Sequence, residues 1–263
     1  SLCFFLNVNA QRKKSQKYDL KSSQLSGLKF RSVGPAFMSG RIADIAINPE
    51  NENEWYVAVG SGGVWKTSNS GTTWTPIADD QPFYSTGSIT IDPHNSSKIW
   101  LGTGENVGGR HVGIGHGVYM SENGGKKWKD MGLKFSEHIS KIIVSPNDPN
   151  LVFVASQGPL WSPGGDRGLF RSTNGGEDWE NVLSVNEWTG VTDIVIDHNN
   201  PTTLYAATWQ RHRNVAAYMG GGPGTSIYKS VDNGKTWIEI KNGLPGSNLG
   251  KIGLAISPFD SSI

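Results

Sequence analysis

Two carboxylates are the strongest candidates for chemistry in this sequence. Glu105 opens the polar stretch ENVGGRHVGIGH, and Asp166 lies near the end of GPLWSPGGDR. A glycoside hydrolase needs two carboxyl groups that flank the scissile bond, and the general acid of the pair needs a raised pKa. We expect Glu105 at the end of a strand, which makes it the stronger catalytic candidate, with Asp166 second.

Cationic and aromatic side chains gather in the same stretches and in a third, QRHRNVAAYMGGGPGT. Arginine and tryptophan together suit a carboxylate, a sugar ring or a peptide backbone as ligand. The alternative is that these stretches pack on their neighbours and that their charges are solvated. Besides Glu105, the candidate ligand-binding residues are Arg110, His111, His116, Trp161, Arg167, Trp209, Arg211, His212 and Arg213.

The histidines do not predict a metal site. His111 and His116 are five residues apart in a glycine-rich stretch near Glu105, where no helix or strand would hold them at ligand spacing. The run from Gly220 to Gly222 is not followed by a helix, so it is not a phosphate-binding loop. We therefore expect neither a metal nor a cofactor.

Composition favours an all-β chain and excludes some partners. The 263 residues include 34 glycines and 10 tryptophans, and charged residues make up 18%. The net charge is +1, with no basic stripe to follow a phosphate backbone, so we expect no nucleic-acid partner. No stretch approaches the ~20 apolar residues of a membrane span.

One nine-residue pattern occurs four times. The copies are KTSNSGTTW, MSENGGKKW, RSTNGGEDW and KSVDNGKTW, and their tryptophans are Trp74, Trp128, Trp179 and Trp237. The tryptophans are 54, 51 and 58 residues apart. A repeat of roughly fifty residues is typical of solenoids and propellers.

The residues between the copies favour a propeller over a solenoid. Each repeat holds an alternating apolar run that ends in a turn, then runs such as WYVAVG, GVWKTS and WTPIA, which gives four short strands and no amphipathic helix. This order is typical of a β-propeller blade. LGKIGLAISPFDSS, from Leu249, matches the first strand of a fifth blade. We predict an all-β partial propeller of four four-stranded blades plus that strand.

The repeated loop has a mechanical role in this interpretation. It joins the third and fourth strands, and its Asn or Asp accepts hydrogen bonds from backbone N–H groups inside the turn. The glycine two places later adopts a positive φ, and the tryptophan covers the turn. The acceptors are Asn69, Asn123, Asn174 and Asp232, and the glycines are Gly71, Gly125, Gly176 and Gly234.

The pattern S-x-[DN]-x-G-x-x-W resembles the Asp-box, or bacterial neuraminidase repeat, with Thr67 in the serine place of the first copy. The chain is similar to secreted bacterial proteins with a sortilin-type propeller, often named glycosyl hydrolases, and more distantly to xyloglucan hydrolases and sialidases. The resemblance implies a larger propeller whose active face lies opposite the Asp-box turns. It also implies a catalytic Asp where this chain has Gly60, so the chain departs from that pattern.

The N-terminus suggests export. We interpret residues 1–10 as the remnant of a secretory signal peptide, residues 11–26 as a polar spacer and residues 27–263 as the N-terminal part of the propeller. Cys3 is either removed with the signal or serves as a lipid anchor. We expect a secreted, cell-surface or periplasmic bacterial protein.

Three functions follow from these observations. The first is a binding module that takes a protein, peptide or glycan through the loops opposite the Asp-box turns. The second is a glycoside hydrolase that uses Glu105. The third is a structural component of a cell-surface or secretion assembly. In each case the remaining blades of its own propeller are an expected partner.

Overall fold

The computed structural model describes residues 21, 27, 41–246 and 248–259. Contacts between Cα atoms divide the chain into residues 1–38 and residues 39–263, and every strand belongs to the second unit. The expected signal remnant with Cys3 lies outside the described residues, as does the expected spacer apart from Lys21.

The second unit contains four antiparallel sheets of four strands, and three of them run in plain chain order. Blade 1 is β1 (Ile42–Ile47), β2 (Trp55–Val59), β3 (Gly63–Thr67) and β4 (Thr75–Pro76). Blade 2 is β5 (Thr86–Asp92), β6 (Asn95–Thr103), β7 (Val118–Ser121) and β8 (Lys129–Asp130). Blade 3 is β9 (Ile139–Ser145), β10 (Asp148–Ser156), β11 (Gly168–Ser172) and β12 (Glu180–Leu183). Blade 4 is β13 (Thr189–Ile196), β14 (Leu204–Gln210), β17 (Ile227–Ser230) and β18 (Ile238–Ile240).

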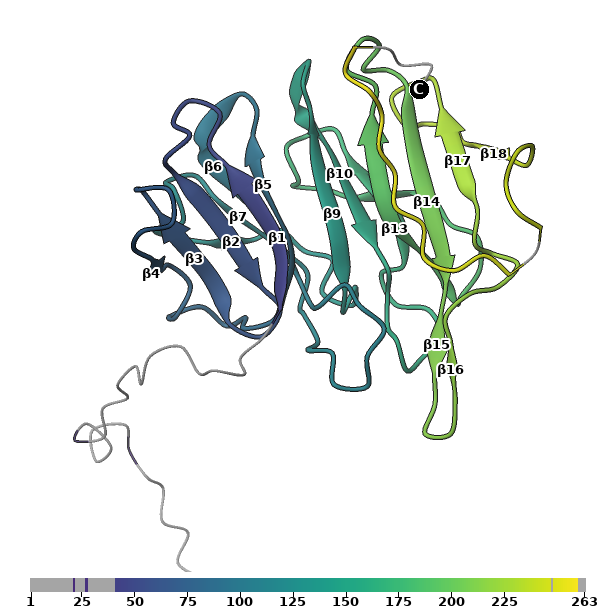
Figure 1. The fold of residues 1–263 in the computed structure, drawn as a ribbon, viewed down its shortest axis with the longest axis horizontal. Helices are drawn as coiled ribbons and strands as arrows, with labels where there is room; N and C mark the ends of the chain where they lie inside the picture. The colour runs from purple at the N-terminus through teal and green to yellow at the C-terminus, as the bar shows by residue number, and fades with distance from the viewer. Residues whose placement is uncertain (1–20, 22–26, 28–40, 247, 260–263) are drawn as a thin grey trace, which may run out of the picture. The chain divides into compact units, whose positions relative to one another are not determined.

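The predicted blades are therefore confirmed, and the described residues contain no helix (Figure 1). Accordingly, no described segment is a helix long and apolar enough to cross a bilayer. The sequence did not predict the small hairpin of β15 (His212–Arg213) and β16 (Tyr218–Met219), which projects from blade 4 between β14 and β17 (Figure 1).

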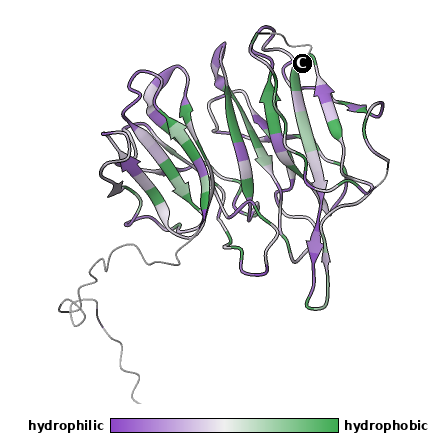
Figure 2. Cartoon of the chain, in the orientation of Figure 1, coloured by the Kyte–Doolittle hydropathy of each residue, from purple (hydrophilic) through white to green (hydrophobic). Residues whose placement is uncertain are grey.

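The first strand of each of blades 2 to 4 packs against the blade before it. Three apolar clusters fill the spaces between blades 1 and 2, 2 and 3, and 3 and 4. Ile89, Ile142 and Ile194 hold equivalent positions in β5, β9 and β13, and each side chain is buried in the cluster shared with the preceding blade. The equivalent Ile45 of β1 is 52% exposed. Figure 2 shows apolar residues along these first strands.

The four Asp-box turns have the predicted geometry. In the second, the Ser121 hydroxyl donates to Asn123 Oδ1 at 3.0 Å and accepts from the Gly125 N–H at 2.9 Å. Asn123 Oδ1 also accepts from the Lys127 N–H at 2.8 Å, and Gly125 has φ 84°. The other three turns repeat these bonds, with Thr67, Ser172 and Ser230 as the hydroxyl residues.

The tryptophans of two turns also connect neighbouring blades. The indole N–H of Trp128 donates to the carbonyl of Ile77, 3.2 Å away in blade 1. The indole of Trp179 donates to the Met131 carbonyl of blade 2 at 2.7 Å. The sequence predicted only that these rings cover their turns, not that they bond a neighbouring blade. Trp237 differs, because its indole N–H donates to the Gly234 carbonyl of its own turn. The repeated loop therefore stabilises both the turn and the blade interface.

The expected fifth-blade strand lies beside blade 4 without joining a ladder. Residues 249–259 are assigned no strand. The Leu254 N–H donates to Asp193 Oδ2 on β13 at 2.9 Å, just as the Ile89 N–H of blade 2 donates to Asp44 Oδ2 on β1 at 3.0 Å. The segment thus takes the place of a first strand, although no second strand pairs with it in the described part of the chain.

Two alanine substitutions test how the turn glycines act. Gly176 and Gly243 have φ of 88° and 84°, but a β-carbon at Gly176 would lie 2.8 Å from Trp100, whereas at Gly243 it would meet nothing within 4 Å. Gly243→Ala should cost about 1–2 kcal/mol of unfolding free energy from backbone strain. Gly176→Ala should cost a further 1–3 kcal/mol, roughly, because it overpacks the blade interface. Urea unfolding measures both, and equal losses would show that packing at Gly176 is unimportant.

Candidate functional site

The loops that join the second and third strands of blades 2, 3 and 4 form one candidate surface. They comprise residues 104–117, 157–167 and 211–226. The chain connections between successive blades leave the sheets at the same ends, because the strands alternate in direction. We call these loops and connections the rim. Every residue proposed from the sequence for catalysis or binding lies on it or beside it.

Glu105 is buried, with 2% of its surface exposed, and both carboxylate oxygens are engaged. Oε1 accepts from Arg41 Nη2 at 2.5 Å, and Oε2 accepts from the Gly113 N–H at 2.9 Å. Arg41 Nη1 lies 2.9 Å from His111 Nε2. The partly exposed Arg41 thus covers a buried carboxylate and forms an ion pair with it.

The absence of a side chain at Gly60 has a direct structural explanation. A β-carbon there would contact Glu105 Oε1 and would lie 2.9 Å from Glu105 Cγ. Glu105 from blade 2 therefore occupies the space into which a residue at position 60 of blade 1 would project. The sequence showed only that this position lacks a carboxylate.

Arg167 is buried and donates all five of its N–H groups to backbone carbonyls. Nε donates to Gly164, Nη1 to Gln157 and Trp188, and Nη2 to Pro159 and Ser162. Burial lowers the pKa of Arg167 to about 10, while the charges of Glu137 and Glu187 act in the opposite direction. The guanidinium is thus the centre around which the loop of blade 3 is folded.

Three more arginines connect the loop of blade 2 with that of blade 4. Arg211 is fully buried, and its Nη1 donates to the Val107 carbonyl at 3.0 Å. Arg213 Nη2 donates to the Gly108 carbonyl at 3.0 Å, and Arg110 Nη2 donates in the reverse direction to the Val215 carbonyl at 2.9 Å. Burial, with the neighbouring charge of Arg167, lowers the pKa of Arg211 to about 9.

The structure therefore differs from the expectation that all candidate residues face outward. Glu105, Arg167, Trp209 and Arg211 are buried. The two arginines supply donors to loop carbonyls that are removed from water and would otherwise be unpaired. Asp166 is half-buried, and its Oδ2 accepts from the Phe135 N–H at 2.9 Å. For the exposed or half-buried candidates, ligand contact stays a prediction; these are Arg110, His111, His116, Trp161, His212 and Arg213.

Four exposed aromatic rings lie on the outward surface of the rim, and the sequence interpretation singled out only Trp161 among them. Tyr84 is 65% exposed, Phe135 72%, Trp161 44% and Tyr218 40%. They come from the connection into blade 2, the connection into blade 3, the loop of blade 3 and the hairpin of blade 4. An aromatic residue inside a polar connection is the signal that would have identified the others.

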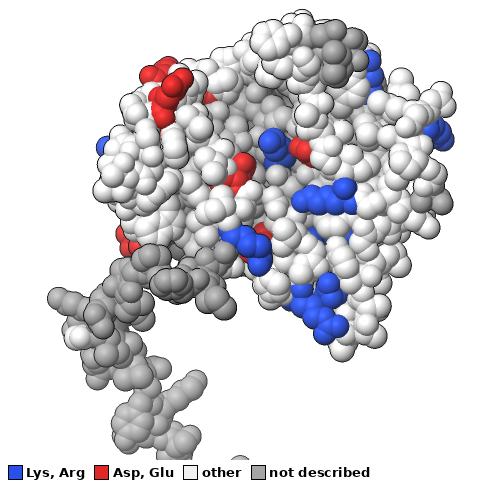
Figure 3. Space-filling view, in the orientation of Figure 1, with Lys and Arg blue, Asp and Glu red and all other residues white. Residues whose placement is uncertain are grey.

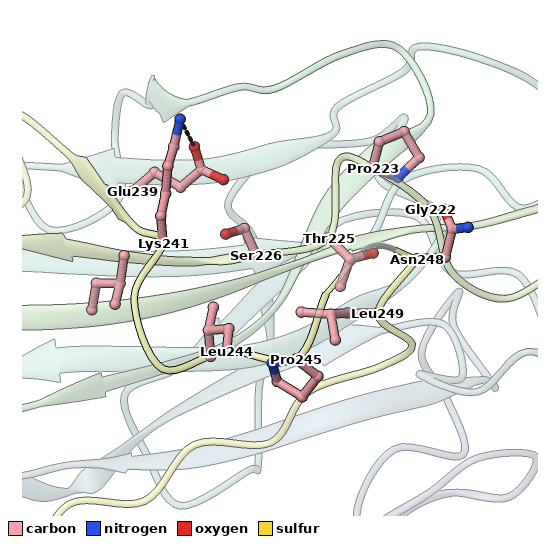
Figure 4. A pocket seen from close by; sticks show the side chains of 11 residues that line it. Gly222, Pro223, Thr225, Ser226, Glu239, Lys241, Leu244, Pro245, Asn248 and Leu249 are labelled. Atoms are coloured by element: carbon pink, nitrogen blue, oxygen red, sulfur yellow. Dashed lines mark ion pairs between the residues drawn. The ribbon is translucent and has the colours of Figure 1, made fainter.

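Two of the hollows beside blade 4 adjoin its 211–226 loop. One, of about 170 Å³, is lined by residues including Thr225, Leu244 and Leu249, with the Glu239–Lys241 ion pair among its residues (Figure 4). The other, of about 620 Å³, is lined by Gln210, Met219, residues 220–223 and Asn248.

The positive side chains stand apart on the face shown in Figure 3 and form no continuous stripe.

His138 is completely buried next to this network. Its pKa is lowered to about 3 by burial and by the charges of Arg211 and Arg167, and a backbone interaction with Glu105 opposes the shift. The ring is therefore neutral at physiological pH. No cluster of His, Cys, Asp and Glu that could hold a metal occurs among the described residues.

Comparison with known proteins identifies the family. The Sortilin-Vps10 family, described as sortilin, neurotensin receptor 3, matches residues 116–251, just over half of the chain. The chain belongs to the Sortilin-Vps10 family. The matched part runs from the end of the blade 2 loop through blades 3 and 4, so it includes three Asp-box turns and the arginine-centred loop of blade 3.

Relatives of this Sortilin-Vps10 chain include xyloglucanases. The xyloglucanase of Hypocrea jecorina is 27% identical over 238 residues, and Xgh74A of Acetivibrio thermocellus is 23% identical over 241 residues. These matches cover 77% and 79% of this chain but only 26% of each relative, so the chain spans about a quarter of the length of the curated relatives it matches.

Solved structures confirm the propeller fold. The GH74 enzyme of Niastella koreensis superposes with a TM-score of 0.63 at 21% identity, covering 84% of this chain and 32% of the enzyme. An ancestral GH74 enzyme superposes with a TM-score of 0.59 at 24% identity, covering 78% of this chain and 24% of the enzyme.

His138 makes the stability of this Sortilin-Vps10 propeller depend on pH. Its pKa is about 3 in the folded state and about 6.5 when unfolded, so between these values only the unfolded chain takes up the proton. The contribution of neutral His138 to the free energy of unfolding is fully present above pH 6.5, and it falls by about 1.4 kcal/mol for each pH unit below that value. His138→Gln should remove this component, whereas His116→Gln, at an exposed histidine, should not. Urea unfolding between pH 7 and 5 measures the slopes, and identical slopes for wild type and His138→Gln would contradict the assignment.

Proposed function

We propose that the rim binds a glycan chain through its exposed aromatic rings. The observation that carries the proposal is the outward placement of Tyr84, Phe135, Trp161 and Tyr218 on four separate rim segments, while Glu105 is paired with Arg41 and the buried arginines bind backbone carbonyls. The C–H faces of sugars are apolar and their edges polar, and an aromatic ring beside hydrogen-bonding loops provides for both. The named relatives act on a polysaccharide, which supports a glycan over a peptide.

Binding is better supported than catalysis by Glu105. A general acid needs a proton and access to the glycosidic oxygen. Glu105 is 2% exposed, its Oε1 is paired with Arg41, and its Oε2 is bound to the Gly113 N–H. Hydrolysis stays a second candidate because a buried carboxylate does lie at the end of β6 and the relatives are hydrolases.

Export from the cell suits a glycan-binding role, and we propose it on the basis of the N-terminal pattern. We also propose that further blades complete the propeller, since Ile45 of β1 exposes the apolar face that is covered at equivalent positions in blades 2 to 4. A fixed protein partner on the rim would instead favour the role of a structural component in an assembly.

Substitution of the aromatic rings tests glycan binding. Phe135→Ala and Trp161→Ala should each weaken binding to tamarind xyloglucan about tenfold, because each removes an exposed stacking surface of the rim. Trp74→Ala is the matched control, since Trp74 is 39% exposed but lies in an Asp-box turn on the opposite face. Isothermal titration measures the affinities. Equal weakening by Trp74→Ala, or no binding by wild type, would contradict the proposal.

A separate substitution distinguishes binding from hydrolysis. Glu105→Gln keeps the shape of the side chain but removes its charge, so binding of xyloglucan should survive within about threefold. We expect no reducing ends to be released by either form. Release by the wild-type protein that disappears in Glu105→Gln would establish the hydrolase instead.

A further inference from the structure

The 157–167 loop is built around the buried Arg167, and the buried Arg211 also donates to the Gly158 carbonyl of this loop at 3.2 Å. Its eleven residues place the carbonyls of Gln157, Pro159, Ser162 and Gly164 on the guanidinium of Arg167, and Trp188 from the following connection supplies the fifth carbonyl. Arg167 is 4% exposed, and no carboxylate lies within ion-pair distance of it among the described residues. The guanidinium therefore binds backbone alone.

Only arginine fits this role. The guanidinium has five N–H donors in a rigid plane, whereas a lysine ammonium has three donors around a point charge. The backbone of Gly158 approaches closely, because a β-carbon there would lie 2.7 Å from Arg167 Nε and 2.8 Å from Arg167 Cζ. Gly158 also has φ 69°, so the loop passes over the guanidinium at a residue without a side chain.

The same loop presents the exposed rings. Trp161 lies between Pro159 and Ser162, whose carbonyls both accept from Arg167 Nη2, so the backbone on either side of Trp161 is held by one nitrogen. Asp166, next to Arg167, donates its N–H to the Phe135 carbonyl at 3.1 Å and accepts from the Phe135 N–H at 2.9 Å. The exposed rings of Phe135 and Trp161 are thus both attached to backbone that adjoins the buried guanidinium.

We propose that Arg167 is a positioning residue for ligand binding: it does not touch the ligand, but its five carbonyl contacts set the placement of Trp161 and Phe135 on the rim. This inference rests on the proposed glycan-binding function. The sequence suggested Arg167 as a direct ligand contact. In this inference Arg167 instead acts indirectly, through the side chains of Trp161 and Phe135.

Arg167→Lys tests the inference, with Arg171→Lys as the matched control. Arg171 is a half-buried arginine of β11 that donates to the Asn233 carbonyl near an Asp-box turn, on the face away from the rim. Arg167→Lys should weaken xyloglucan binding about tenfold, and Arg171→Lys by less than twofold. In Arg167→Ala, 10 mM methylguanidinium should restore part of the affinity by reoccupying the five carbonyls, whereas methylammonium should not.

A second readout needs no ligand. In protein labelled with 5-fluorotryptophan, the ¹⁹F resonance of Trp161, assigned by Trp161→Phe, should shift or broaden in Arg167→Lys, while that of buried Trp100 stays unchanged. An unchanged Trp161 resonance in Arg167→Lys overturns the positioning role. So does a rescue of Arg167→Ala in which methylammonium restores xyloglucan affinity as well as methylguanidinium does. A shifted Trp161 resonance with wild-type xyloglucan affinity supports positioning by Arg167 and overturns the proposed role of these rings in glycan binding.

Discussion

The structure depends on the packing of each blade's first strand against the blade before it. Ile89, Ile142 and Ile194 are fully or almost fully buried at equivalent places in β5, β9 and β13, and the clusters around them join successive sheets. Because apolar burial is the main stabilising contribution and adjacent sheets share their clusters, the blades stabilise one another as a series. The strand ends from which the rim loops leave are held in place by this packing.

A second constraint shapes the rim itself. Loops without regular structure leave carbonyl groups that cannot stay unpaired once they are buried. Arg167, Arg211 and Arg213 meet this need with guanidinium donors, and two of them join segments more than a hundred residues apart. The buried arginines therefore support the rim from within, and exposed aromatic rings form part of its outward surface. The arginines that suggested a ligand contact are instead largely hydrogen-bonded to backbone carbonyls.

The periodic features were predictable because they depend on local chemistry. The spacing of Trp74, Trp128, Trp179 and Trp237 located all four blades, and the hydroxyl, Asx and glycine of each turn behave as their local geometry requires. The contacts of the rim were not predictable, because they join distant segments. Arg211 reaches Val107 across 104 residues, and Glu105 fills the space beside Gly60 of another blade. Residue type alone does not distinguish an arginine that binds a ligand from one that binds five carbonyls.

The rim is thus proposed as a surface for aromatic contact, with Glu105 held in an ion pair with Arg41. A crystal structure of the protein with a xyloglucan oligosaccharide tests this most directly. We expect sugar rings over Trp161 and Phe135, with the Arg41–Glu105 pair intact and the contacts of Arg167 unchanged. A glycosidic oxygen beside Glu105 with Arg41 displaced, or an oligosaccharide on the Asp-box face, would contradict it.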